Sequence, residues 1–339
     1  MDQFPLPLSD CCSLNAKRGT WKWFVQGIGR RYLHRELIAE RFIKRRKARL
    51  LHAHFGPSGV WALRIKHALR LPLITTFYGY DMSHVDFLAS YEQRYLNLFQ
   101  EGDLFLVEGP YMKTRLMEMG CPAEKIAIQR IAIPLANLPF RSRLPKRHGE
   151  NIVIVFSGRF VEKKGLLNAL QALVQVRSTH PDFEFRIIGD GPLKPAIVQF
   201  IQDHDMNNHV HLLGFLPYHD YLEQMKAADL FLHPSVTASD GDSEGGAPTT
   251  ILEAQALGLP VISTFHADIP YVVVPDQSAL LSNEGDIDGL AKNIARLMVD
   301  QECWRRMGMA GHRHVEEFHD IEKEIQRLES IYSGLIERT

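Results

Sequence analysis

Cysteine is scarce in this sequence, because a chain of 339 residues contains only Cys11, Cys12, Cys121 and Cys303. Their spacing provides neither paired metal ligands nor a disulfide framework, and such scarcity is typical of a reducing compartment. No apolar run reaches the ~18 residues that a membrane-spanning helix needs. The first residues also lack the basic stretch and apolar core of a signal peptide. We therefore expect a cytoplasmic protein without a transmembrane helix.

The sequence also lacks an excess of either positive or negative charge. Lysine and arginine number 39 against 40 aspartates and glutamates, which gives a net charge of −1. This balance provides no general attraction for nucleic acid, so we expect no nucleic-acid partner. Hydrophobic residues make up 45% of the chain, as in ordinary soluble proteins. Because single hydrophobic cores stop growing at about 250–300 residues, the length predicts two domains.

The amino-terminal segment, residues 1–49, departs from this balance. Residues 17–49 contain twelve lysines and arginines against Glu36 and Glu40 alone, with Trp21 and Trp23 among them. Two interpretations stay open: a solvated helix face with a loose tail, or a peripheral contact with an anionic membrane surface, such as the inner face of the cytoplasmic membrane. A nucleic-acid interpretation is weaker, because no recognised motif accompanies the charge.

Short apolar runs alternate with helical spacing over residues 150–315. The predicted strands are 152–156, 185–188, 210–213, 230–232, 261–263 and 279–281, and the predicted helices include 218–227 and 287–298. Repeated βα units of this length predict a doubly wound parallel sheet that binds its ligand at the carboxyl ends of the strands. Residues 50–145 show a less complete version, with strands at 50–55, 73–77 and 104–107. A polar, basic stretch at 141–149 is the predicted linker.

An acidic loop, a double glycine and a short helix follow one another over residues 240–260. The glycine pair 245–246 allows the backbone to approach a ligand closely. Pro248 suits the first position of a helix, and Gly258 suits the position just past its end. Free amides at such a helix start favour an anion, and Glu253 then faces the hydroxyls of a ligand. This arrangement predicts a site for a nucleotide diphosphate and its sugar.

The segment Ser157–Gly165 follows the first predicted strand of the second domain and contains Arg159 and Lys164. Two cations at a strand end can hold a pyrophosphate and neutralise the charge that grows on it when a sugar leaves. Each unit-charge pair at ~4 Å contributes roughly 4 kcal/mol at an effective dielectric of ~20, which can partly replace a metal ion. We therefore expect neither a metal nor another cofactor.

Together these segments resemble the donor-binding domain of a retaining glycosyltransferase of family 4, which has the GT-B architecture. The matching stretches are 157–165, 188–192, 213–215, 228–235 and 244–260, and the resemblance covers nearly all of residues 50–335. It implies an α/β fold of two facing, doubly wound Rossmann-like domains, the first of which can be incomplete. It also implies that the C-terminal helix, residues 316–339, packs back on the acceptor-side domain 50–145. The pattern is most similar to bacterial enzymes of exopolysaccharide and capsule assembly.

The resemblance also implies a role for individual residues. Arg159 and Lys164 bind the donor diphosphate, Glu253 binds the nucleotide ribose, and Glu244 lies near the donor sugar. Further donor contacts are expected from Gly158, Gly245, Gly246, Ala247, Pro248 and Thr249, and acceptor-side contacts from His54, Tyr78 and Asp81. The implied reaction transfers a hexosyl unit from a nucleotide-diphosphate sugar to a hydroxyl of a sugar or lipid-linked oligosaccharide, in extracellular or capsular polysaccharide biosynthesis.

Three features depart from the family pattern. Eight residues instead of seven separate Glu244 from Glu253, so Glu244 sits one residue out of step. Tyr78 occupies a position that usually holds a histidine, and a tyrosine does not titrate near neutral pH. No strand and glycine-rich loop precede Leu50, so we expect a shortened amino-terminal region.

These departures leave other functions open. A non-catalytic nucleotide-sugar binder or partner subunit is the main alternative, and a GT-B epimerase is a weaker one. A metal site at Asp240 and Asp242 is disfavoured, because nothing else of the glycosyltransferase architecture that uses Asp-x-Asp matches. The stretch Gly189–Pro192 is too short for a dinucleotide fingerprint, which argues against a dehydrogenase.

Overall fold

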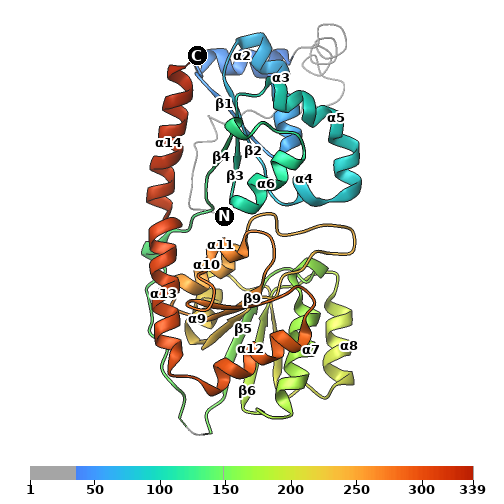
Figure 1. Cartoon of the computed structure of the whole chain (residues 1–339), viewed down its shortest axis with the longest axis vertical. Coiled ribbons are helices and arrows are strands. Elements are labelled where there is room, and N and C mark those ends of the chain that lie inside the picture. The colour runs from blue at the N-terminus through green and yellow to red at the C-terminus, as the bar shows by residue number, and fades with distance from the viewer. Residues whose placement is uncertain (1–35, 148, 339) are drawn as a thin grey trace.

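The computed structural model describes residues 36–147 and 149–338, which form two α/β lobes (Figure 1). A four-stranded parallel sheet of order β1-β2-β3-β4 lies in the first lobe, and a six-stranded parallel sheet of order β10-β9-β8-β5-β6-β7 lies in the second. The prediction of two Rossmann-like domains is confirmed. Every predicted strand forms, with its ends shifted by at most two residues.

The first lobe packs its helices on a short sheet with an aromatic core. Its elements are α2 (Leu37–Arg45), β1 (Leu51–His54), α3 (Gly56–Leu69), β2 (Leu73–Thr76), α4 (Tyr80–Ser83), α5 (Val85–Glu101), β3 (Leu104–Val107), α6 (Pro110–Glu118) and β4 (Ile126–Ile128). Phe77, Tyr95, Phe99 and Phe105 are at most 2% exposed and lie in contact, which fixes α5 against the sheet. The sequence analysis missed β4, because three residues carry too little apolar pattern to reveal a strand.

The second lobe is the larger. Its elements are β5 (Ile152–Ser157), α7 (Leu166–Arg177), β6 (Phe183–Ile188), α8 (Lys194–Asp203), β7 (Val210–Gly214), α9 (Tyr218–Ala227), β8 (Leu230–Leu232), α10 (Thr249–Ala256), β9 (Val261–Thr264), α11 (Ile269–Val272), β10 (Ala279–Ser282), α12 (Ile287–Val299) and α13 (Cys303–Phe318). The chain runs outward from β5 to β7, then returns to β8 and continues to β10 on the other side. This reversal between β5 and β8 is the topological switch point, where open parallel sheets bind ligands.

The C-terminal helix α14 (Ile321–Glu337) leaves the second lobe and runs along the first (Figure 1). The crossing is secured by backbone hydrogen bonds, in which Ile133 N donates to His319 O at 2.9 Å and Ile321 N donates to Ile133 O at 3.2 Å. Farther along, the Tyr332 hydroxyl lies 2.6 Å from His52 Nδ1. The end of the chain therefore holds the two lobes together.

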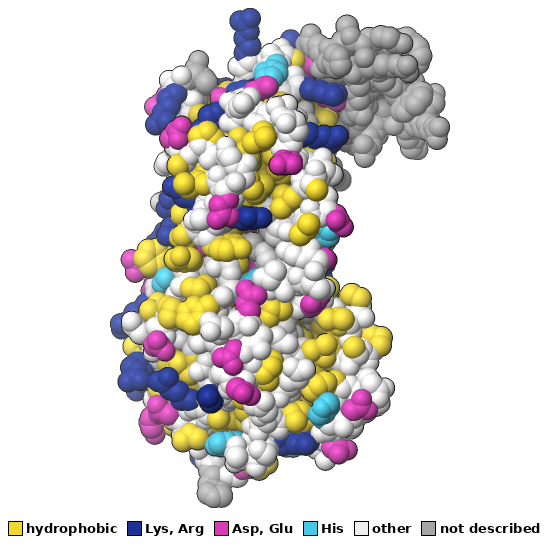
Figure 2. Space-filling view, turned by 45° about the vertical axis from the view of Figure 1, so that its right-hand side comes forward, with side chains coloured by type: hydrophobic (Ala, Val, Ile, Leu, Met, Phe, Trp, Pro, Cys, Tyr) yellow, Lys and Arg dark blue, Asp and Glu magenta, His cyan; other side chains and the backbone are white. Residues whose placement is uncertain are grey.

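Much of the predicted basic segment, including Trp21 and Trp23, lies outside the described residues. The prediction of a shortened amino-terminal region concerns mostly the same residues. Its described part forms α2, which packs on α3. None of the helices within residues 36–338 combines the length and the apolar composition that crossing a membrane requires. On the face shown in Figure 2, acidic and basic side chains are interspersed over both lobes, as the net charge suggests.

The contact between α14 and residues 129–130 gives a first prediction. The Glu324 carboxylate accepts hydrogen bonds from Gln129 Nε2 at 2.7 Å and from Arg130 N at 3.0 Å. In Glu324→Ala, Gln129 Nε2 keeps its hydrogen bond to the Glu324 backbone oxygen, but Arg130 N loses this partner, which costs roughly 1–3 kcal/mol. We expect a thermal midpoint several degrees below that of the wild type, measured by calorimetry. Glu329→Ala, at an exposed position on the same helix, is the matched control, and equal midpoints for the two variants would contradict this role of Glu324.

Candidate functional site

A cavity of about 750 Å³ opens at the carboxyl ends of β5 and β6, beside the switch point. It is lined by the loop after β5, the loop after β6, the segment before α9, and the first turns of α9 and α10. Among the predicted donor-site residues it brings together Gly158, Arg159 and Glu253. Because these residues come from distant parts of the chain, the cavity is a product of the fold.

Arg159 provides positive charge at the cavity wall. Its side chain is exposed, and it forms no ion pair or hydrogen bond with the residues that the structure describes. A guanidinium group presents five N–H donors in a planar fork that matches phosphate oxygens. The cavity therefore has a cation available for an anionic ligand.

Glu253 lies on α10 and provides a carboxylate. Tyr221 donates a hydrogen bond to Glu253 Oε2 at 2.6 Å, and Tyr218 donates to Oε1 at 3.3 Å. Burial raises the pKa of Glu253, and the two tyrosine hydrogen bonds oppose that shift. Both oxygens are thus held in position and keep lone pairs that can accept hydrogen bonds from the hydroxyls of a ligand.

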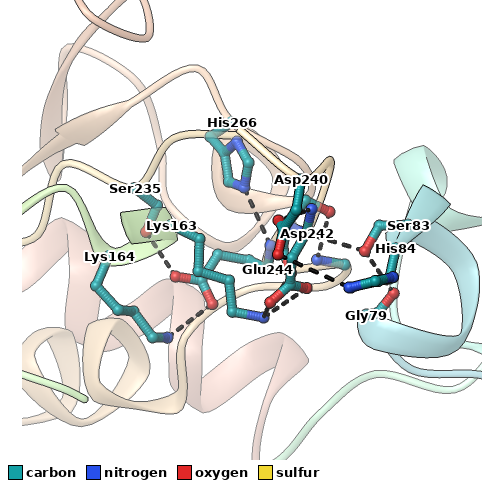
Figure 3. A network of polar contacts seen from close by, with 12 residues as sticks. Gly79, Ser83, His84, Lys163, Lys164, Ser235, Asp240, Asp242, Glu244 and His266 are labelled. Atoms are coloured by element: carbon teal, nitrogen blue, oxygen red, sulfur yellow. Dashed lines mark hydrogen bonds and ion pairs between the residues drawn. The ribbon is translucent and has the colours of Figure 1, made fainter. Parts of the chain in front are cut away.

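Lys164 and Glu244 form a buried ion pair next to this cavity (Figure 3). Lys164 Nζ lies 2.7 Å from Glu244 Oε2, and the Ser235 hydroxyl donates to Oε1 at 2.8 Å. Burial tends to raise the pKa of Glu244, but the charges of Lys164 and His233 and the hydrogen bonds from Lys164 and Ser235 together lower it. With side chains 15% and 5% exposed, the pair is screened little by solvent.

His266 fixes the backbone that carries Glu244. Glu244 N donates to His266 Nε2 at 3.1 Å, so the ring proton lies on Nδ1, which faces Glu284 Oε1 at 2.6 Å. The next residue, Gly245, has φ of +77°, a left-handed conformation that favours glycine. The extra residue in this loop is thereby absorbed, and Glu244 reaches Lys164 despite its offset in the sequence.

The predicted phosphate-loop residues lie behind the cavity lining. Gly245, Gly246, Ala247 and Pro248 are buried and do not line the cavity. Gly245 and Gly246 lie against Gly79 and Glu108 of the first lobe, in a seam between the lobes. A Cβ on Gly245 would lie 2.1 Å from Gly79 Cα. Pro248 precedes α10 as its capping residue, one position earlier than predicted, and Thr249 is exposed. Thr250, which was not predicted, lines the cavity instead.

Carboxyl groups also meet at this seam, where Asp81 and Asp268 are buried and Glu108 is half-buried. Glu108 follows β3, and its Oε2 would lie 1.7 Å from a Cβ on Gly246. No hydrogen-bond donor within residues 36–147 and 149–338 reaches the Glu108 carboxyl, whereas Asp268 accepts from Tyr111 N at 2.8 Å. Burial raises the pKa of Glu108 to about 7, with Asp268, Asp81 and Glu244 adding to the shift. Burial likewise raises the pKa of Asp268 to about 6.

The predicted acceptor-side residues cluster at the carboxyl ends of β1 and β2. His54 Nδ1 lies 2.7 Å from the Tyr78 hydroxyl. Burial raises the pKa of Tyr78 to about 12, so this hydroxyl stays protonated at neutral pH. Asp81 is only 1% exposed, and its carboxylate accepts hydrogen bonds from Gly56 N at 2.7 Å and Tyr78 N at 2.8 Å. Asp81 therefore shapes this region and offers no surface for direct contact.

The acidic loop at Asp240 and Asp242 docks between the lobes (Figure 3). Lys163 Nζ lies 3.0 Å from both Asp242 carboxylate oxygens, and His84 Nε2 lies 3.7 Å from Asp240 Oδ2. In the described part of the chain, no group of three or more His, Cys, Asp or Glu side chains could hold a metal ion. The loop's carboxylates thus serve contacts within the protein.

Sequence reasoning missed several residues of the site, notably Tyr218, Tyr221, Ser235 and Glu108. Glu108 could have been found, because it directly follows a predicted strand at the sheet edge where ligands bind. The two tyrosines become relevant only when α9 and α10 are packed together. Ser235 belongs to a matched segment, but nothing in its spacing predicts contact with Glu244.

Two Rossmann-like lobes of this kind, with a cavity at the carboxyl ends of the strands of the second lobe, define the GT-B class of fold. Comparison with known proteins agrees. The family described as "Glycosyl transferases group 1" matches residues 140–314, and "Glycosyltransferase Family 4" matches residues 13–135. The chain belongs to the family of glycosyl transferases group 1.

Two glycosyltransferases are similar to this chain over more than two thirds of its length. The chain is 38% identical over 251 residues to the putative colanic acid biosynthesis glycosyltransferase WcaL of Escherichia coli K12, covering 74% of this chain and 61% of the relative. It is 36% identical over 246 residues to the amylovoran biosynthesis glycosyltransferase AmsK of Erwinia amylovora, covering 72% and 60%. The matches thus span about 60% of the length of these relatives.

Among solved structures, HepE of Anabaena in complex with UDP is similar, with a TM-score of 0.76 and 19% identity. The match covers 88% of this chain and 82% of HepE. At this identity the likeness concerns the fold.

The seam carboxyls predict a dependence of stability on pH. The Glu108 pKa is about 7 in the folded protein and near 4.5 when unfolded, so the folded state holds a proton that the unfolded chain has lost. The contribution of Glu108 to the free energy of unfolding is therefore fully present below pH ~4.5 and is lost as the pH rises through ~7. Glu108→Gln mimics the protonated group. We expect its thermal midpoint to match the wild type at pH 5 and to exceed it by several degrees at pH 8.

Differential scanning fluorimetry at the two pH values measures this difference. Glu92→Gln, an exposed position on α5, is the control and should follow the wild type at both. A Glu108→Gln midpoint with the same offset at pH 5 and pH 8 would show that Glu108 does not titrate in this range.

Proposed function

We propose that the protein is a retaining glycosyltransferase, which moves a hexosyl unit from a nucleotide-diphosphate sugar to an acceptor hydroxyl. The observation that carries this proposal is the presence of the unpaired Arg159 guanidinium and the oriented Glu253 carboxylate in one cavity at the switch point. A nucleoside diphosphate has the complementary groups, because its phosphates are anionic and its ribose hydroxyls donate hydrogen bonds.

In the proposed mechanism, Arg159 and Lys164 hold the two phosphates. When the bond between the sugar and the diphosphate breaks, negative charge grows on the leaving phosphate, and prearranged cations stabilise it. The 2.7 Å contact with Glu244 holds Lys164 in place, and we place Glu244 next to the donor sugar. The proposed reaction uses neither a metal nor another cofactor.

The proposed pathway is the synthesis of an extracellular or capsular polysaccharide, supported by the biosynthetic roles in the names of WcaL and AmsK. The acceptor is then a sugar or a lipid-linked oligosaccharide. We place the reaction in the cytoplasm, at the inner face of the membrane. The basic last turn and following residues of α2, including Lys44 and Arg45, support contact between residues 17–49 and an anionic surface.

A ligand panel tests the donor site. We expect nucleoside diphosphates or their sugar conjugates to raise the thermal midpoint, because a ligand at a hundredfold its dissociation constant stabilises the folded state by ~2.7 kcal/mol. UDP and GDP with their hexose conjugates make up the panel, measured by scanning fluorimetry without added metal. Release of free hexose or transfer to an acceptor separates an enzyme from a binding subunit, which would show the midpoint shift alone. No response to any nucleotide would overturn the proposal.

The ion pair gives a sharper prediction. Lys164→Ala alone leaves the Glu244 carboxylate buried without its cation, which destabilises the fold by roughly 3–5 kcal/mol. The double variant Lys164→Met/Glu244→Gln removes both charges and should keep the wild-type thermal midpoint. We expect its turnover to fall ~10²–10³-fold, as when one transition-state donor is lost.

Turnover is measured as nucleoside diphosphate released from the donor identified in the panel. Lys226→Ala, which removes an exposed pair with Glu223, is the control and should keep full turnover. Wild-type turnover in the folded double variant would remove Lys164 from the mechanism.

A further inference from the structure

The backbone of Phe55 has an unusual conformation. This residue follows β1 and caps α3, with φ of +71° and ψ of +142°. That region is nearly restricted to glycine, and a bulky side chain there costs of order 1–3 kcal/mol. The strain is fixed from both sides, because Phe55 N donates to Thr76 O at 2.9 Å in the sheet and Ser58 N donates to Phe55 O at 3.0 Å in the helix.

The Phe55 ring does not compensate for this strain by burial. The residue is 48% exposed, whereas core aromatic residues of the same lobe are at most 2% exposed. A glycine at this position would avoid the strain and give up only partly buried contacts. Folding alone therefore does not require a strained phenylalanine with an exposed ring at this position. Strained residues cluster at ligand sites.

The Phe55 ring contacts a residue next to the point where the two lobes touch. Its centroid lies 4.7 Å from that of Tyr78, at an interplanar angle of 47°. Tyr78 directly precedes Gly79, where an added Cβ would lie 2.4 Å from the Glu244 carbonyl oxygen. The ring pair therefore belongs to the segment of the first lobe whose backbone touches the loop that carries Glu244.

We propose that Phe55 and Tyr78 form a stacking platform for a sugar ring of the acceptor. A pyranose presents C–H bonds on one face and hydroxyls at its edge, and this pair offers an apolar aromatic surface beside a polar edge. That edge consists of the Tyr78 hydroxyl and His54 Nδ1, 2.7 Å apart. The inference rests on the proposed function, since it names the binding surface for the acceptor of that reaction.

The test uses the full-length protein with the methyl glycosides of glucose, galactose and mannose as probes, in the presence of UDP. Saturation-transfer NMR should show transfer from the protein to ring C–H protons of at least one glycoside. We expect the signal to fall at least fivefold in Phe55→Gly and Phe55→Leu, and to be retained in Phe55→Trp, which keeps an aromatic face.

Two further readouts separate loss of the platform from damage to the fold. Phe55→Gly relieves the backbone strain, so its thermal midpoint should stay equal to the wild type or rise by about 2–4 °C. Its midpoint shift with UDP should be unchanged. Phe215→Gly, which removes a ring that is 87% exposed at the donor cavity, should show the opposite pattern, with a weaker UDP shift and an unchanged glycoside signal.

Each remaining outcome decides the question. Wild-type protein that responds to UDP but shows no saturation transfer to any of the three glycosides would overturn the platform while leaving the donor site intact. An undiminished glycoside signal in Phe55→Gly would also overturn it. A protein that responds to no nucleotide fails the proposed function itself, which is a separate result.

Discussion

The contact between Gly79 and Gly245 is the constraint on which the rest of this structure depends. Each glycine approaches the other lobe so closely that a side chain on either would overlap backbone atoms at 2.4 Å or less. This contact brings the carboxyl end of β2 against the loop that carries Glu244. Because Gly245 also has a positive φ, the loop turns and directs Glu244 toward Lys164 in its own lobe. The two sides of the site are thereby joined at one point of backbone contact.

The seam around this contact is electrostatically unusual. Asp81, Glu108 and Asp268 all have a raised pKa because of burial, and only the carboxylates of Asp81 and Asp268 receive backbone hydrogen bonds. The contact between the lobes therefore covers carboxyl groups that resist ionisation, so the stability of this contact depends on pH.

The fold could largely be predicted from the sequence, because buried parallel strands such as Ile152–Ser157 are continuous apolar runs bounded by glycine. That Arg159 and Glu253 lie near each other could be predicted in the same way, since both adjoin predicted strand and helix ends, and they line one cavity. The burial of Gly245–Pro248 could not be predicted, because it results from contact with the first lobe rather than from local pattern. The strain at Phe55 could not be predicted either, because a phenylalanine before a glycine is an ordinary pattern for the end of a strand.

The central claim is that one cavity holds a nucleoside diphosphate between a cationic wall and an oriented carboxylate. A crystal structure of the protein with a bound nucleoside diphosphate tests this claim most directly. We expect phosphate oxygens within hydrogen-bonding distance of Arg159 and Lys164, and the ribose hydroxyls at Glu253. A diphosphate bound elsewhere, with Glu253 contacted only by Tyr218 and Tyr221, would contradict it.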